Sequence, residues 1–112
     1  MSYVPGVELP PAIKAYFDGA NAFDADRATF GFAPDAVVHD EREDHVGHAA
    51  IRAWIADTIQ RYQTQFAVVD AAEATGVTHV RVTMSGTFPG SPVTVQFSFR
   101  LERERIQYLD IG

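Results

Sequence analysis

One short run, from Ala36 to Asp40, places an apolar, β-prone segment directly before a carboxylate. The run lies between two segments whose apolar residues recur at the three- and four-residue spacing of amphipathic helices. A strand that delivers Asp40 into a space between apolar helix faces predicts a small pocket with an acidic group in its wall. Acid/base catalysis is one chemistry that such a pocket can perform. The helix-type residues are Ile13, Tyr16, Phe17, Ala20 and Phe23 in the first segment, and Ile51, Trp54, Ile55 and Ile59 in the second.

The remaining elements follow from the apolar period and the turn signals. We expect helices over residues 11–23, 25–32 and 48–61, with Asp24 as the N-cap of the second and Pro34 as its stop signal. A short strand around residues 37–38 and then a loop follow the second helix. After residue 62 the period changes to two, which predicts antiparallel strands through 62–75, 80–85, 93–101 and 106–111. This pattern predicts a single α+β domain over residues 1–112, with helices gathered on one face of a curved sheet.

The strand at 93–101 has the clearest alternation in the chain. One row is apolar and must face the helices, whereas the other row consists of Thr94, Gln96, Ser98 and Arg100. A polar row on the opposite face meets either water or a second copy of the chain. A homodimer through this face is therefore one expected partnership, although its polar character predicts a weak interface.

Composition excludes several classes of protein. The 112 residues are 46% hydrophobic and 21% charged, which is typical of one folded domain rather than a disordered chain. The absence of cysteine excludes disulfides, thiol catalysis and thiolate metal sites. A net charge of −6 without a basic stripe argues against nucleic-acid binding. Residues 1–9 have the character of a loose arm, and residues 1–11 lack the pattern of a signal peptide. No apolar run is long enough to span a membrane, so we expect a cytoplasmic protein without a membrane partner.

Acidic and imidazole side chains gather between residues 39 and 48, and a metal site is the alternative explanation for them. Carboxylates and imidazoles bind divalent cations. However, the chain has neither a His-Glu-x-x-His motif nor a calcium-loop pattern. We therefore expect no metal and no cofactor, and a solvated loop for most of this cluster. Its members are His39, Asp40, Glu41, Glu43, Asp44, His45 and His48.

Several segments together resemble one known family over nearly the whole chain. They are Ala15-Tyr16-Phe17 with Asn21-Ala22 and Asp24, the run from Phe32 to Asp40, Gly47 to Arg52, Phe97 to Leu101, and Arg105-Ile106. In this combination the sequence resembles the nuclear transport factor 2-like superfamily, and within it the SnoaL-like polyketide cyclase and ketosteroid isomerase group. The resemblance implies a cystatin-like cone, in which three N-terminal helices pack on a curved antiparallel sheet. This fold carries isomerases, dehydratases, cyclases and plain binding proteins, so it does not by itself define a function.

The same resemblance implies roles for individual residues. Tyr16 precedes Asn21 by five residues, as in ketosteroid isomerases, where that tyrosine donates a hydrogen bond to the developing enolate oxygen. Asp40 falls on the position of the general base. The position that carries a protonated aspartic acid in those enzymes is Phe97 here, so half of the oxyanion hole is missing and steroid isomerisation is doubtful.

Further residues are candidates for the pocket. His39 is either a second acid/base group or a packing residue, and in an unbroken strand it points away from the face of Asp40. Asp110 is similar in position to a catalytic aspartate of SnoaL-like cyclases, with a register that differs by one. Apolar residues are expected to shape the cavity, namely Phe17, Trp54, Met84, Phe97 and Phe99.

Two functions remain open from the sequence. The first is a cofactor-free isomerase, lyase or cyclase that acts on a small apolar carbonyl compound through Asp40 and Tyr16. The second is a non-catalytic ligand-binding or dimerisation module, in which Tyr16 and Asp40 only satisfy each other.

Overall fold

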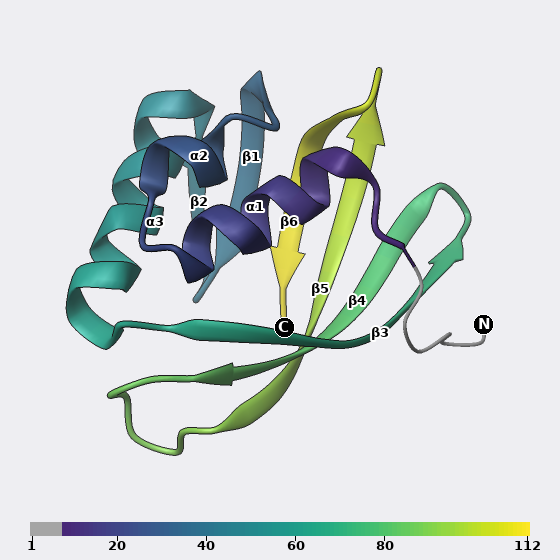
Figure 1. Cartoon of the computed structure of the whole chain (residues 1–112). Coiled ribbons are helices and arrows are strands. Elements are labelled where there is room, and N and C mark those ends of the chain that lie inside the picture. Colours follow the sequence, from purple (N-terminus) through teal and green to yellow (C-terminus); the bar gives the residue numbers. More distant parts are fainter. Residues whose placement is uncertain (1–7) are drawn as a thin grey trace.

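The computed structural model describes residues 8–112 (Figure 1). The expectations for the N-terminal arm and for a leader fall mainly on residues 1–7, which lie outside the described residues. The elements are, in chain order, α1 (Pro11–Asn21), α2 (Ala25–Thr29), β1 (Phe32–Asp40), β2 (Glu43–Val46), α3 (Gly47–Tyr62), β3 (Gln65–Ala74), β4 (Val77–Ser85), β5 (Val93–Glu102) and β6 (Arg105–Ile111).

The strands form one curved six-stranded sheet in the order β2-β1-β6-β5-β4-β3. Figure 1 shows the three helices together on one side of this sheet, with α3 against β1 and β2 and with α1 crossing in front of β6. The expected α+β architecture is thus confirmed. One detail differs, because β1 pairs with β6 in the parallel sense while the other pairings are antiparallel.

Local sequence signals explain where the helices begin and end. Pro11 occupies the first helical position of α1, where a missing backbone N–H costs nothing. The carboxylate of Asp24 accepts a hydrogen bond from the Arg27 amide over 3.1 Å, which confirms it as the N-cap of α2. The helix α2 ends at Thr29, earlier than predicted, and Gln63 ends α3 in the left-handed conformation at φ 49°.

The segment after α2 departs most from the prediction. The strand β1 has nine residues, which is longer than the short strand predicted around residues 37–38, and it includes Pro34. Pro34 lies in an irregular stretch of the pairing between β1 and β6. The predicted loop contains a second strand, β2, joined to β1 by a hairpin. Glu41 and Arg42 make this turn at φ 51° and 66°, the geometry that a two-residue hairpin loop requires.

An aromatic core joins α1 to the inner face of the sheet. Phe17 of α1 packs on Phe97 and Phe99 of β5, with ring centroids 5.5 and 5.8 Å apart, which confirms that the apolar row of this strand faces the helices. The side chain of Asn21 also fixes α1 to β3. Its amide donates to the Phe66 carbonyl over 2.9 Å, and its oxygen accepts from the Phe66 amide over 2.7 Å. This pair of bonds holds α1 over the sheet and closes one side of the space beneath it.

The outer face of the sheet carries a polar row across paired strands, made by Asp44, His39, Asp110, Ser98 and His79. It is the face to which the sequence assigns a second copy of the chain, and that assignment stays a prediction. Among residues 8–112, no helix has the length and apolar character needed to cross a membrane.

Candidate functional site

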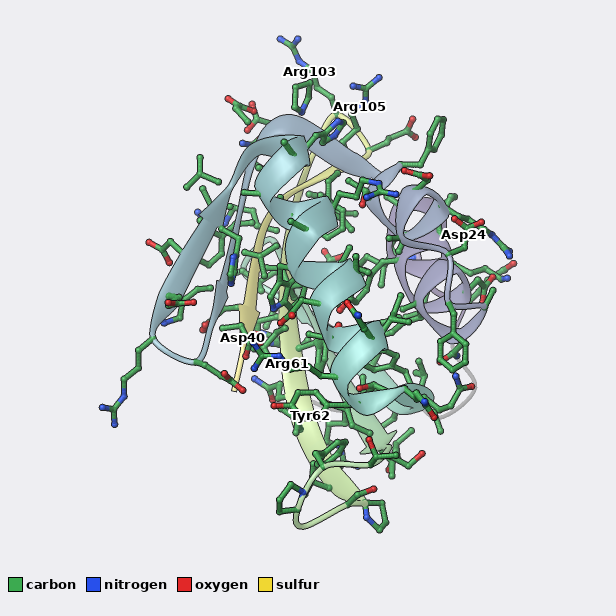
Figure 2. The ribbon with its side chains drawn as sticks, turned by 90° about the vertical axis from the view of Figure 1, so that its left-hand side faces the viewer. Asp24, Asp40, Arg61, Tyr62, Arg103 and Arg105 are labelled. Atoms are coloured by element: carbon green, nitrogen blue, oxygen red, sulfur yellow. The ribbon has the colours of Figure 1, made fainter. Side chains whose placement is uncertain are left out.

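A cavity of about 280 Å³ lies between α1, α3, the end of β1 and the strands β3 to β6. Figure 2 shows Asp40 at the end of β1, beside the C-terminal end of α3, where Tyr62 lies. Most of the wall is apolar, and the polar groups come from several elements. The lining residues are Tyr16, Asp40, Glu41, Trp54, Thr58, Tyr62, Thr64, Phe66, Met84, Phe88, Pro89, Phe97 and Ile111.

Asp40 is held by Trp54 of α3. The indole Nε1 donates a hydrogen bond to Oδ2 of Asp40 over 3.2 Å. The indole ring is stacked with two other rings, that of Tyr16 at 6.4 Å and 8° between planes, and that of His45 of β2 at 5.6 Å and 27°. Asp40 is thus a half-buried carboxylate, and one of its oxygens accepts a hydrogen bond from a ring that is itself held by two stacking contacts.

Tyr16 supplies a hydroxyl group to the same cavity. The residue is 2% exposed, and burial raises the pKa of its phenol strongly, with the negative charge of Asp40 as a second cause. Within residues 8–112 the hydroxyl has no hydrogen-bond partner. Its oxygen is not completely buried, so it remains accessible from the cavity. A protonated donor that faces the cavity is therefore free for an oxygen of a bound molecule.

The structure brings some of the predicted pocket residues together. Trp54, Met84 and Phe97 line the cavity with Tyr16 and Asp40. Phe97, the residue at the position where the resemblance implies a protonated acid in ketosteroid isomerases, is thus an apolar residue of the cavity wall.

Two predicted pocket phenylalanines lie elsewhere. Phe17 and Phe99 are buried behind Tyr16, with ring centroids 5.0 and 6.1 Å from its ring, and are not among the lining residues. They face the aromatic core because α1 and β5 each present several apolar residues on one face, and only part of that face borders the cavity. Their contribution is to fix Tyr16 from behind.

His39 and Asp110 also lie away from the cavity, on the outer face of the sheet. The strand alternation that brings Asp40 inward turns His39 outward. Its Nδ1 lies 2.7 Å from Oδ1 of Asp44, and this hydrogen bond, with smaller contributions from the charges of Asp110 and Asp40, raises the pKa of the imidazole. Asp110 is exposed and pairs in register with His39.

Other lining residues escaped the sequence analysis. Thr64, Phe66 and Phe88 carry no motif, and their role depends on how β3 and the 86–92 turn close over the end of α3. The Thr87 amide donates to the Tyr62 carbonyl over 2.8 Å, which fixes that turn against the helix. Only the strand period around Phe66 could have indicated an inward position.

The acidic and imidazole cluster is dispersed in the structure. His39 bonds to Asp44, His45 stacks on Trp54, and Nε2 of His48 lies 2.6 Å from a backbone carbonyl. Within the described part of the chain, no three such side chains are arranged to hold a metal ion.

A larger groove of about 860 Å³ lies at the opposite end of α3, where Figure 2 shows Arg103 and Arg105. Its polar groups include Arg52, whose Nε donates to Oδ1 of Asp26 over 2.5 Å. The groove contains neither Tyr16 nor Asp40, the two residues to which the sequence assigns acid/base roles. The smaller cavity is therefore the candidate site.

A curved sheet under helices, with a carboxylate and a phenol in one apolar cavity, defines an α+β pocket protein of the cystatin-like, nuclear transport factor 2-like class. The model of the SnoaL-like domain family matches residues 13–109, and the chain belongs to this family. A comparison with curated protein sequences gave no match.

Solved structures agree with this assignment. A protein from Sinorhizobium meliloti, described as a proposed polyketide cyclase, is 36% identical, with a TM-score of 0.88 over 93% of this chain and 95% of that chain. A Catenulispora acidiphila protein with a ketosteroid isomerase-like fold has a TM-score of 0.81 at 18% identity, over 94% and 86% of the two chains. A cystatin-fold protein from Novosphingobium aromaticivorans has a TM-score of 0.78 at 21% identity, over 96% and 99%. The latter two likenesses concern the fold alone.

Proposed function

We propose that this protein is a cofactor-free enzyme of the isomerase, lyase or cyclase type, which moves a proton at the carbon next to a carbonyl group in a small apolar compound. The observation that carries the proposal is that the Asp40 carboxylate and the free hydroxyl of Tyr16 line the same mostly apolar cavity. The likeness to a proposed polyketide cyclase at 36% identity supports the same class of chemistry.

Each group has a defined task in this proposal. Asp40 removes the proton from the carbon, and Tyr16 donates a hydrogen bond to the oxygen on which negative charge develops. Because the pKa of Tyr16 is raised, the phenol stays protonated and acts as a donor. Trp54 keeps the carboxylate oriented toward the cavity. With Phe97 in place of a second donor, the oxyanion receives less stabilisation, so the substrate must have an α-proton that is already acidic.

The alternative from the sequence, a binding module in which Tyr16 and Asp40 only satisfy each other, requires a bond between them. Among residues 8–112, Asp40 accepts from Trp54 and not from Tyr16. Both polar groups of the pair therefore keep capacity for a bound molecule.

The test is hydrogen–deuterium exchange at the α-carbon of small cyclic ketones and 1,3-diketones in D₂O, followed by NMR. The wild-type protein is expected to accelerate exchange, and Asp40→Asn is expected to reduce the acceleration by about 10²-fold or more. The matched control is Asp35→Asn, because Asp35 is an exposed carboxylate of the same strand, bonded to Gln107 over 3.1 Å and outside the cavity. Wild-type protein that binds phenols, as enolate mimics, but catalyses no exchange would instead establish the ligand-binding module.

A further inference from the structure

Thr64 contributes a second free hydroxyl to the cavity. It lies between the left-handed Gln63, which ends α3, and the first residue of β3, and it is 4% exposed. It lines the cavity with Tyr16, and within residues 8–112 its hydroxyl has no hydrogen-bond partner. The oxygen of this hydroxyl is not completely buried, and it borders the cavity. A hydrogen-bond partner for it is therefore expected inside the cavity.

Thr58 provides an internal comparison, because it lines the same cavity from α3. Its hydroxyl donates to the Ile55 carbonyl of its own helix over 2.8 Å. A threonine that back-bonds to its helix needs no ligand. The two residues therefore share chemistry and location but differ in whether the hydroxyl is already used.

The Thr64 hydroxyl borders the cavity and has no partner among residues 8–112, so it is available to a bound molecule. A valine of the same shape would offer that molecule no hydrogen bond. We propose that Thr64 binds a second oxygen of the ligand, and that this site takes small compounds with two oxygen functions, such as hydroxyketones or 1,3-diketones. The inference rests on the proposed function for the first oxygen, which Tyr16 would contact.

The size of the cavity limits this class further. At about 280 Å³ the cavity lies at the lower end of the range of small-molecule pockets, which is roughly 300–1,000 Å³. This size favours compounds with one or two rings. The substrate class is thus a small dioxygenated carbonyl compound.

The test measures binding rather than turnover, through the fluorescence of Trp54, which is the only tryptophan in the chain and lines the cavity. The probes are matched pairs in which a methyl group replaces one hydroxyl: the three isomers of dihydroxybenzene against the three isomers of methylphenol. The quantity of interest is the ratio of the two Kd values within each pair. It is measured in wild type, Thr64→Val and the matched control Thr58→Val.

For at least one isomer, Thr64→Val is expected to shift the ratio about 5- to 10-fold against the dihydroxy compound, the effect of one lost hydrogen bond. Thr58→Val should leave the ratio as in wild type. Thr64→Val keeps the shape of the side chain and breaks no hydrogen bond within residues 8–112, so it should fold about as stably as wild type, which thermal unfolding verifies. An unchanged ratio for all three isomers in Thr64→Val, or no binding of any probe by wild type, would overturn the proposal.

The outcome is separable from the proposed function. If ketones undergo no catalysed exchange but the ratio depends on Thr64, the enzyme assignment fails and the dioxygenated ligand class stands. If exchange depends on Asp40 but the ratio of the Kd values is the same in Thr64→Val as in wild type, only the proposal for Thr64 fails.

Discussion

Trp54 Nε1 donates a hydrogen bond to Oδ2 of Asp40 over 3.2 Å, and this bond joins α3 to the end of β1 inside the cavity. The indole of Trp54 is also stacked with the rings of Tyr16 and His45. The proposed base and the proposed oxyanion donor therefore share one aromatic neighbour. Any movement of Trp54 would alter the position of both groups.

Replacing Trp54 with phenylalanine keeps an aromatic ring but removes the donor to Asp40. We expect the α-proton exchange rate to fall about 10-fold, since a hydrogen bond to a charged group contributes roughly 1.5–3 kcal/mol and part of this fixes the orientation of the base. The measurement is exchange by NMR under saturating and limiting ketone, because a positioning role predicts a lower kcat with little change in KM.

Trp54→His supplies the matched control, because an imidazole can still donate to a carboxylate. It is expected to recover part of the loss seen in Trp54→Phe. Equal rates in the two variants and in wild type would show that the indole serves packing alone.

Asn21 is expected to contribute to the stability of the fold and not to catalysis. In Asn21→Ala, the Phe66 amide and carbonyl both lose their partner, so the free energy of unfolding should fall by about 2–4 kcal/mol. Asn21→Asp keeps an acceptor for the Phe66 amide and should lose less. Urea denaturation measures the three proteins, and a loss below about 1 kcal/mol in Asn21→Ala would contradict this role.

His39 gives a pH-dependent prediction. Its pKa is raised, chiefly by the hydrogen bond from the imidazole to Asp44, so folding favours the protonated ring. The resulting stabilisation is fully present below the unfolded pKa of about 6.5 and is lost as the pH rises through the folded value. An NMR titration, assigned with His39→Gln, should show a midpoint above about 6.5.

Asp44→Asn should move the midpoint of His39 downward, because it removes the hydrogen bond that is the largest cause of the raised pKa. His39→Gln should leave α-proton exchange unchanged, because His39 faces away from the cavity. A large loss of exchange in His39→Gln would instead show that His39 takes part in catalysis.

The sequence predicted the elements whose residues carry a strong apolar period. The helices around Tyr16 and Trp54 and the strand around Phe97 were found because one face of each is buried. The hairpin strand β2 was missed, since Glu43 and Asp44 are poor strand formers and resemble a solvated loop. Cross-strand pairing with β1, including the bond between His39 and Asp44, stabilises that strand, and a local pattern does not reveal such pairing.

The residues of the candidate site also differ in whether the sequence reveals them. Asp40 and Tyr16 stand out because each is a polar group in an apolar pattern. Thr64 does not, since a threonine between a helix and a strand is ordinary, and its burial depends on segments distant in sequence. The strand order that places Asp110 beside His39, outside the cavity, is likewise a property of the assembled sheet.

Tyr16→Phe separates catalysis from folding most sharply. The variant keeps the aromatic contacts of Tyr16 with Phe17, Phe99 and Trp54 and removes only a hydroxyl that has no partner within residues 8–112. The free energy of unfolding should therefore stay within about 1 kcal/mol of wild type or rise.

Exchange, in contrast, should fall about 10²- to 10³-fold in Tyr16→Phe, the usual effect of removing an oxyanion donor. An alkaline absorbance titration supplies an independent measurement. Because burial raises the pKa of Tyr16, its phenol should fail to ionise while the protein is folded and should ionise once the chain is unfolded. The absorbance gained on unfolding at alkaline pH should therefore be smaller in Tyr16→Phe than in wild type. Undiminished exchange in this variant would remove Tyr16 from the mechanism and leave Asp40 as the single reacting group of the cavity.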